Sequence, residues 1–518
     1  MTYNSHHVIY IDGFLQPSIT YIGGKIIIAR YEHPTISRVW SNENKLKLWQ
    51  KTEFAVIEAR ANLGLINREI FTSIFEKLGN QEIDIAWWLK REEETKHDLN
   101  AFIDERLRFL PIELQRHWHD GLTSYDTEES AFVSTLRESV SLLKEELKPL
   151  IKRLEEMSIE YRYTVMLART HGQWAEIESF GKRCLTWLVI LREGLRNLER
   201  TEENLKFSKL SGAIGNYQGI TAEIEEEALR ILGFQPFYGA TQILPRELYA
   251  PLAQAICQIV LSLNKIAIDI RLGARSGITI LQEPFGKKQK GSSAMPHKKN
   301  TISGEKIEGM ARAAKGYMNM LMDNVVTWEE RAIEQSSVER IAWPDLFHVA
   351  IHAIKTMNKV LQGLTVYPDN MLKEINESCG CYAAGEVKEF LRHLGAPYGL
   401  GTEGAYRIVQ LAAFNVFEPS EEAKRLRENP PTSIAEAQRM LLPLRNTRKP
   451  ISTQDIIANG KLVVSDRLEA NKETIEEWNR ILVKIFERPE NREKWNQLFA
   501  FEYLLKGENT LYEKILGV

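Results

Sequence analysis

LAQAICQIVLSLNKIAIDIRL, Leu252–Leu272, is the stretch that decides the fold class. Its apolar residues recur at three- and four-residue spacing, which is the period of an α-helix. Three other stretches share the pattern: Ser141–Met157, Leu185–Phe207 and Lys306–Met322. Several apolar positions spread widely around the helix axis, so such helices need neighbours on two faces. We therefore predict an all-α bundle of helices about twenty to thirty residues long without internal proline, either in one large monomer or shared between subunits.

Length and net charge limit the number of domains and the kinds of partner that we expect. The 518 residues, 43% of them hydrophobic, suffice for about two to three domains around a large core. The formal net charge of -3 gives no global field for nucleic acid or a membrane, so an anion site must be a local cluster of cations. We therefore expect a small-molecule substrate and further copies of this chain as partners, with neither nucleic acid nor a membrane.

The cysteines and the amino terminus indicate the compartment. Cys184, Cys257, Cys379 and Cys381 are too few and too scattered for a disulfide framework, so we expect reduced thiols. The spacing of the last two favours an incidental turn over a metal site, and we expect no metal. The first residues lack the pattern of a signal peptide, and we expect no apolar stretch as long as a membrane span. These features predict a cytoplasmic protein.

The stretch GSSAMPHKKN, Gly291–Asn300, follows a basic run and cannot belong to a core. Small hydroxyl side chains, backbone amides and lysines suit a loop that closes over an anion. A solvated basic loop is the alternative that composition alone favours. A phosphate-binding P-loop is excluded, because Ser292 stands where that motif requires lysine.

This loop resembles the signature loop of the fumarase/aspartase superfamily, in the form found in the adenylosuccinate lyase family. Other segments resemble that family's motifs in the same order along the chain: Arg30-Tyr31, His97-Asp98, Thr123-Ser124, Thr170-His171, Gln242, and Arg331 to Arg340. The resemblance implies an all-α, three-domain fold whose central long-helix bundle is shared in a homotetramer with composite active sites. It also implies that no cofactor is needed.

The resemblance further implies β-elimination of fumarate from adenylosuccinate, giving AMP, and from its carboxamide-imidazole analogue SAICAR, giving AICAR. Such a reaction needs a base for a weakly acidic C–H and an acid for the departing nitrogen. By carry-over from the family, Ser292 is the base and His171 the acid. Lys298 neutralises the succinyl carboxylates, and Glu305 orients Lys298 or His171. Whether Ser292 or its neighbour Ser293 is the base stays open.

Substrate contacts follow from the same resemblance. They are Arg30, Tyr31, Lys96, His97, Asp98, Thr123, Ser124, Gln242, Ser293, Met295, Asn300, Arg331, Ser336 and Arg340. The residues themselves allow simpler roles. Thr123 and Ser124 suit a helix start, where capping and anion binding are compatible. We expect His171 at another helix start and Gln242 in a turn, while surface pairing with Glu330 and Glu339 would also explain the two arginines.

Several positions depart from the family pattern: Lys96 replaces arginine, Trp174 replaces a histidine, and Thr301, Ala332 and Gln335 replace other residues. The loss of an arginine at Lys299, an aspartate at Ala332 and a histidine at Gln335 lies near the presumed nucleotide pocket, and it leaves the elimination machinery intact. An alternative function is therefore a lyase of the same mechanism that acts on another N-succinyl amine. A non-catalytic scaffold is a third hypothesis, which retention of Ser292, His171, Lys298 and Glu305 opposes.

Composition shifts mark the domain boundaries. We predict an amino-terminal arm outside the resemblance, a helical first domain, the central bundle with the signature loop, and a small helical carboxyl-terminal domain: residues 1–29, 30–124, 125–366 and 367–518. The tail beyond Lys472 is longer than the resemblance explains. Its aromatic residues predict a docking face: Trp478, Trp495, Phe499 and Tyr503.

Overall fold

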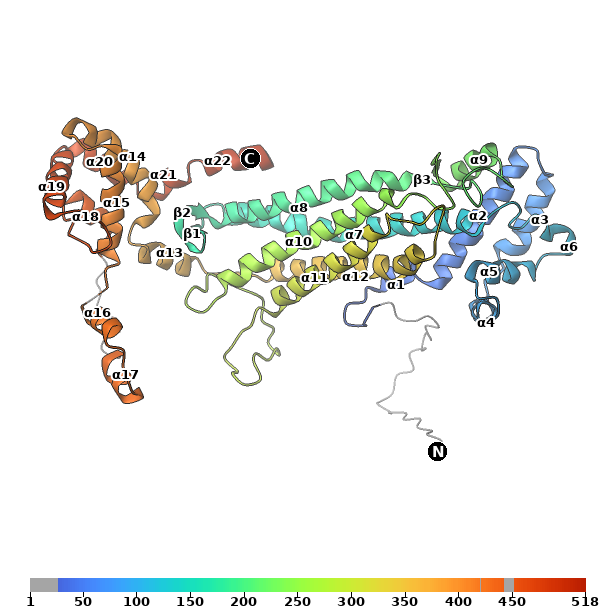
Figure 1. The fold of residues 1–518 in the computed structure, drawn as a ribbon, viewed down its shortest axis with the longest axis horizontal. Helices are drawn as coiled ribbons and strands as arrows, with labels where there is room; N and C mark the ends of the chain where they lie inside the picture. Colours follow the sequence, from blue (N-terminus) through green and yellow to red (C-terminus); the bar gives the residue numbers. More distant parts are fainter. Residues whose placement is uncertain (1–26, 420, 442–450) are drawn as a thin grey trace. The chain divides into compact units, whose positions relative to one another are not determined.

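The computed structural model describes residues 27–419, 421–441 and 451–518, and these are mainly helical (Figure 1). The arm expected in residues 1–29 lies almost entirely outside them. Contacts divide the chain into two compact units, each described by itself. Unit 1 comprises residues 1–143, 198–257 and 313–352, and unit 2 comprises residues 144–197, 258–312 and 353–518. The three-domain division stays a prediction.

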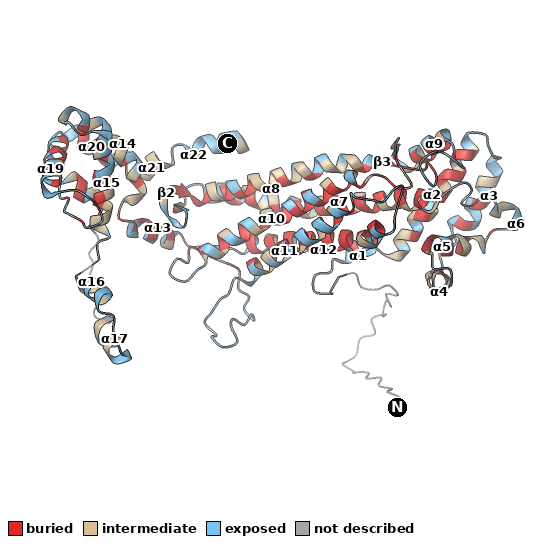
Figure 2. Ribbon diagram, viewed as in Figure 1, coloured by how far each residue is buried: buried red, intermediate tan, exposed pale blue. Residues whose placement is uncertain are grey.

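Five long helices confirm the predicted all-α bundle. They are α7 (Ser124–Glu160), α8 (Phe180–Glu202), α10 (Ala250–Gly273), α11 (Ile302–Asp323) and α12 (Glu334–Gln362). Buried and exposed positions alternate along each of them (Figure 2), as the sequence period predicts. The expectation of proline-free helices was wrong, because Pro149 lies inside α7 and Pro344 inside α12.

Unit 1 begins with a series of helices, several of which have a side-chain cap at their first turn. The helices are α1 (Pro34–Val39), α2 (Asn42–Asn62), α3 (Arg68–Gly79), α4 (Ile85–Thr95), α5 (Asp98–Leu107), α6 (Ile112–Gln115) and, later in the chain, α9 (Ala222–Leu232). The side chains of Ser41, Asn67 and Asp84 accept backbone N–H groups at the starts of α2, α3 and α4. A core that includes Trp49 and Trp88 holds α2 to α6 together.

Unit 2 carries a β-hairpin and the carboxyl-terminal helices. The hairpin pairs β1 (Val165–Thr170) with β2 (Gln173–Ser179). The helices are α13 (Pro368–Glu377), α14 (Ala384–Gly395), α15 (Thr402–Val416), α16 (Glu421–Glu428), α17 (Ile434–Leu441), α18 (Thr453–Ala458), α19 (Lys472–Phe486), α20 (Pro489–Gln497), α21 (Phe501–Leu505) and α22 (Glu508–Leu516). Two further short sheets pair β3 (Phe207–Ser208) with β4 (Gln235–Pro236) in unit 1 and β5 (Leu281–Gln282) with β6 (Thr365–Val366) in unit 2.

The tail has a different role from the predicted docking face. Trp495 is only 2% exposed and belongs to the core formed by α14, α15 and α18 to α20. Trp478, Phe499 and Tyr503 pack against that core from its edge. These aromatic residues therefore stabilise unit 2 internally.

One helix, Arg246–Gly273, is long and apolar enough to cross a membrane by length and composition. This corrects the expectation that no stretch reaches that length. About half of its most apolar window, 56%, is buried inside the structure, as in the core helices of many proteins, so the signal is weak. All four cysteines are free thiols.

Candidate active site

The start of α7 places two of the predicted substrate residues. Ser124 is the first residue of the helix, and the Thr123 N–H donates to Asp126 Oδ2 over 2.9 Å. The predicted helix start is therefore confirmed. Asp126 is itself fixed by Lys209, whose Nζ lies 2.6 Å from Asp126 Oδ1 with both side chains fully buried. The buried ion pair joins the first turn of α7 to the segment that follows β3.

His97 faces this helix start. Its Nδ1 accepts the Asn100 N–H at 3.4 Å, which caps α5. That contact leaves Nε2 as the ring donor, and Nε2 lies 3.3 Å from Ser124 Oγ. Two motifs that are distant in the sequence are therefore neighbours in unit 1.

Asp98 forms the centre of a charged cluster. Arg340 Nη2 donates to Asp98 Oδ2 over 2.9 Å, and Lys45 Nζ lies 3.6 Å from the same oxygen. Burial by itself would raise the pKa of Asp98, but the two cations lower it overall. The Lys45 ammonium also lies over the rings of Trp49 and Trp88, at 4.9 Å and 4.8 Å from their centroids.

Glu128, one turn into α7, adds a second acidic group to this cluster. Burial raises its pKa to about 7, and the negative charge of Asp98 adds to the effect. The cations of Arg340, Lys45 and Arg331 oppose it. A carboxyl group with a pKa near neutrality therefore lies among the predicted substrate residues, which is common at functional sites.

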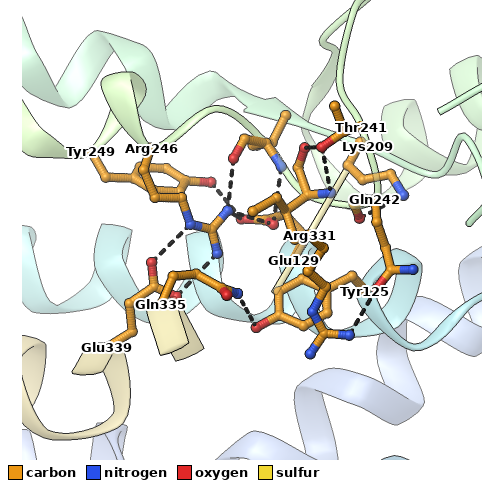
Figure 3. Close-up of polar contacts among 12 residues, drawn as sticks. Tyr125, Glu129, Lys209, Thr241, Gln242, Arg246, Tyr249, Arg331, Gln335 and Glu339 are labelled. Atoms are coloured by element: carbon orange, nitrogen blue, oxygen red, sulfur yellow. Dashed lines mark hydrogen bonds and ion pairs between the residues drawn. The ribbon is translucent and has the colours of Figure 1, made fainter. Parts of the chain in front are cut away.

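The guanidinium of Arg331 lies over the aromatic ring of Tyr125 (Figure 3). Its guanidinium carbon lies 4.1 Å from the ring centroid of Tyr125, which is 5% exposed. Gln335 Nε2 donates to the Tyr125 hydroxyl over 3.1 Å and so holds the ring from behind. Among the described residues no carboxylate forms an ion pair with Arg331. Its charge is thus available to an external anion.

Gln242 orients the same arginine. Arg331 Nη1 donates to Gln242 Oε1 over 2.7 Å, and Gln242 Nε2 donates to the Ala213 carbonyl over 3.0 Å. Lys209 donates to the Gln242 backbone carbonyl over 3.0 Å, as Figure 3 shows. Gln242 lies in a turn before α10, as predicted. One buried lysine therefore fixes both the Gln242 turn and the start of α7.

Arg246 anchors the elements around this region. Its guanidinium contacts Glu129 at 3.0 Å and Glu339 at 2.8 Å, and all three side chains are buried (Figure 3). Because Glu339 is bound to Arg246, it is not the partner of Arg340, which pairs with Asp98 instead. The simple surface pairing with neighbouring glutamates is therefore wrong for Arg340.

The remaining predicted residues of unit 1 are less constrained. Arg30 and Lys96 are exposed, and Lys96 ends α4 in the left-handed region with φ 55°. The Tyr31 ring packs edge-on against His352 with 5.0 Å between centroids. The Ser336 hydroxyl donates to a backbone carbonyl one turn earlier over 3.1 Å.

In unit 2, His171 lies at the tip of the β1–β2 hairpin, which corrects the expected helix start. His171 and Gly172 form a two-residue turn with φ values of 52° and 77°. Two consecutive positive φ angles are typical of the tight turns that join antiparallel strands, and glycine adopts them without steric cost. The imidazole is exposed, and no hydrogen bond is formed to it within the described chain.

The signature sequence forms an irregular loop between β5 and α11. Ser292 Oγ accepts the Met295 N–H over 3.2 Å, which makes a local turn. Ser293, Met295 and Lys298 are exposed, and Asn300 is half-buried. The loop therefore presents its hydroxyl groups and cations to the outside of the chain, as a loop that binds an external anion requires.

The carboxylate of Glu283 connects this loop to α11. It accepts the N–H groups of Ser303 at 3.0 Å and Gly304 at 2.8 Å, which satisfies two amides of the first turn. Glu305, in the same turn, lies 4.0 Å from Arg271. Its predicted contact with Lys298 or His171 is not formed within the described chain.

Each unit thus gathers part of the predicted set. Unit 1 brings together Arg331 with Gln242, His97 with Ser124, and Asp98 with Arg340. In the residues that the structure describes, no hydrogen bond or ion pair joins His171, Ser292 and Lys298 to one another. No group of three or more potential metal ligands occurs among those residues either.

Sequence reasoning missed four polar residues that organise the cluster: Lys45, Tyr125, Glu128 and Lys209. Tyr125 and Glu128 directly follow Ser124 in the sequence, so the predicted substrate contact at Ser124 could have pointed to them. Lys45 had no local signal, because its partner Asp98 is far away in the sequence.

The chain is similar to known lyases. The profile of the family described as "Lyase" matches residues 33–316. Adenylosuccinate lyase of Synechocystis sp. is 35% identical over 387 residues, which are 75% of this chain and 88% of the relative. The adenylosuccinate lyase of Aquifex aeolicus is 35% identical over 405 residues, covering 78% of this chain and 92% of the relative. That of Bacillus subtilis is 34% identical over 403 residues, covering 78% and 91%.

Solved structures confirm the predicted fold. Fumarate lyase from Mesorhizobium sp. BNC1 gives a TM-score of 0.72 at 20% identity, covering 94% of this chain and 98% of that chain. β-Carboxy-cis,cis-muconate cycloisomerase from Acinetobacter calcoaceticus sp. ADP1 gives 0.66 at 17% identity, covering 90% and 97%. With its motifs in the expected order and about a third of the aligned residues identical over most of each relative, the chain belongs to the adenylosuccinate lyase family of the fumarase/aspartase superfamily.

Proposed function

We propose that this enzyme releases fumarate from adenylosuccinate, giving AMP, and from SAICAR, giving AICAR, in the cytoplasm. The observation that carries the proposal is the alignment with curated adenylosuccinate lyases at 32–35% identity over at least 75% of the chain. The presence of Ser292, His171, Lys298 and Glu305 supports it, because the resemblance to the family assigns the elimination to these residues.

In the proposed reaction, ionised Ser292 removes a proton from the carbon next to one succinyl carboxylate. The electron pair of that C–H bond forms the double bond of fumarate, and the adjacent C–N bond breaks. His171, in its protonated form, gives its proton to the departing nitrogen. A serine hydroxyl ionises near neutral pH only beside positive charge and N–H donors, which Lys298 and the loop amides supply.

The charged residues of unit 1 suit the nucleotide phosphate. Arg331 has no carboxylate partner among the described residues, and its guanidinium is held in place by Tyr125 and Gln242. Lys96, His97, Ser336 and Arg340 would complete the proposed phosphate site. Each charged hydrogen bond contributes about 1.5–3 kcal/mol, so a few of them suffice for micromolar binding.

The proposal includes a homotetramer whose active sites combine segments of several subunits. Within one chain His171 lies on the β1–β2 hairpin, whereas Ser292 and Lys298 share the loop before α11 and Glu305 lies in the first turn of that helix. Among the described residues no hydrogen bond or ion pair joins His171 to the other three. Leu261, Ile268 and Leu272 on α10 are 38%, 36% and 47% exposed, although they belong to a long apolar helix. Such a face suits helix packing with another copy of the chain.

The runner-up is a lyase of the same mechanism acting on another N-succinyl amine. One observation favours keeping it: Gln335, which replaces a residue of the family pattern, is 1% exposed, and its Oε1 has no hydrogen-bond partner. A buried unsatisfied carbonyl oxygen is costly, so an N–H donor on the substrate would stabilise it. Substrates that carry an N–H group facing Gln335 Oε1 would bind more tightly than substrates that lack one, so this oxygen would select between nucleobases or amines.

The test is a fumarate-release assay with adenylosuccinate, SAICAR and a series of other N-succinyl amines. Turnover of the first two supports the proposal, turnover of the others alone supports the runner-up, and no turnover supports a non-catalytic scaffold. We expect His171→Ala and Ser292→Ala each to lower kcat by several orders of magnitude. His393→Ala, which changes an exposed histidine on α14, is the matched control and retains normal activity.

A further inference from the structure

The last helix of the chain, α22, packs against the base of the hairpin that carries His171. It lies far beyond residues 33–316, which the family profile matches. All of its contacts described below are within unit 2. They involve the end of α7, the end of β2 and the start of α8, which is where the hairpin joins the long helices.

Glu508 binds the residue that joins the hairpin to α8. Its Oε1 accepts the Ser179 N–H over 2.9 Å, and its Oε2 accepts the Ser179 hydroxyl over 2.5 Å. The same Ser179 Oγ accepts the Lys182 N–H over 2.9 Å and so caps α8. One carboxylate therefore fixes both the last residue of β2 and the first turn of the helix that follows.

Tyr512 fills the adjacent position. It is fully buried, and its hydroxyl donates to the Ser158 carbonyl near the end of α7 over 2.9 Å. A Cβ atom on Gly181 would lie 2.4 Å from that hydroxyl, so only glycine permits the contact. Arg162 closes the arrangement, since its guanidinium lies 4.4 Å from the Tyr512 ring centroid and donates to Asn509 Oδ1 over 3.1 Å.

The preceding helix, α21, supports the strands themselves. Phe501, Leu504 and Leu505 pack against Leu167 of β1 and Ile177 of β2. A two-stranded hairpin is at best marginally stable alone in water, so its conformation depends on what packs against it. In this chain α21 supplies part of that support, together with Ile375 of α13 and Tyr382.

We propose that residues 501–516, which comprise α21 and α22, are a positioning element that fixes the hairpin and thereby the imidazole of His171. The inference rests on the proposed function of His171 as the acid. Glu508 and Tyr512 are positioning residues in this role, because they hold the base of the hairpin and do not reach its tip. A displacement of about 1 Å at a reacting group can lower the rate about a hundredfold.

The role predicts a specific kinetic signature. Proton donation to the leaving nitrogen occurs in the chemical step, whereas phosphate binding depends on unit 1. Removing the helix should therefore lower kcat and leave KM nearly unchanged. If the helix had a purely structural role, its removal would reduce the amount of folded enzyme, and a peptide added afterwards would not restore kcat.

The experiment removes residues 507–518, so that the chain ends at Lys506, and measures fumarate release. We expect kcat to fall about ten- to a hundredfold with KM within about twofold of the full-length value. Addition of the synthetic peptide GENTLYEKILGV, residues 507–518, should restore kcat, and the same peptide with Tyr512→Ala should not. Point variants E508A and Y512F in the full chain test the two contacts singly, with E513A, on an exposed position of the same helix, as the control.

Two outcomes overturn the proposal: normal kcat in the truncated enzyme, or a loss of activity that the wild-type peptide does not restore. Hydrogen exchange of the amides of residues 165–179 gives an independent reading. Exchange should accelerate on truncation and slow again with the peptide, whatever substrate the enzyme prefers. A full-length enzyme without activity on any N-succinyl amine would refute the proposed function, while unchanged exchange would refute the positioning role.

Discussion

Replacing Tyr125 with leucine should weaken substrate binding, because it removes the platform beneath Arg331. The guanidinium lies 4.1 Å from the ring centroid. A cation over an aromatic ring contributes about 0.5–1 kcal/mol when exposed and about 2 kcal/mol when desolvated. Tyr125 is buried and Arg331 half-buried, so we expect a loss of about 1–1.5 kcal/mol, which raises KM about five- to twelvefold. The value of kcat should hold, since the proposed acid and base lie elsewhere.

Initial rates of fumarate release over a range of adenylosuccinate concentrations measure both parameters. Tyr125→Phe keeps the ring and loses only the hydroxyl that accepts from Gln335, so its KM should stay within about twofold of wild type. Tyr249→Phe is the control, because that buried tyrosine donates to Glu129 and does not contact Arg331. The reasoning is refuted if Tyr125→Leu has an unchanged KM while Arg331→Ala raises it.

Three further predictions concern pH, stability and assembly. Burial raises the pKa of Glu128 from 4.5 to about 7. The protonated carboxyl therefore favours folding at acid pH, and this contribution to stability is lost as pH rises through about 7. The melting temperature of Glu128→Gln relative to wild type should increase between about pH 5 and pH 8. Arg246→Ala leaves two buried carboxylates without their cation and should cost about 3–5 kcal/mol, read from chemical denaturation. Mixing the inactive His171 and Ser292 variants should restore partial activity, and no recovery after subunit exchange would count against composite sites.

Helical periodicity was sufficient to predict the long helices, but it did not show that two of them continue through a proline. Pro149 and Pro344 lie inside α7 and α12, although an interior proline normally removes a helix hydrogen bond at a cost of about 3 kcal/mol. Burial of apolar side chains along helices of 37 and 29 residues offsets such a local penalty. The spacing of apolar residues therefore predicts that a segment is helical, but it does not show whether a proline in that segment ends the helix.

Local motifs predicted one helix start correctly and long-range partners poorly. The start of α7 at Ser124 followed from its hydroxyl-rich sequence. The hairpin around His171 was missed, although a His-Gly pair between two strand-like runs is a turn signal. Trp495 was assigned to a surface because its partners are scattered over α14 and α19, and no sequence window contains them together.

The contact between Tyr512 and Ser158 spans 354 positions of the chain. A ribosome therefore completes the hairpin and the start of α8 long before it makes the residue that fits beneath Gly181. Contacts between such distant positions form late, after the loop that separates them has closed. A polypeptide cut short by premature termination, or trimmed by a carboxypeptidase, would keep its long helices and lose this last contact. The support of the hairpin base therefore depends on a residue that is translated several hundred positions after it.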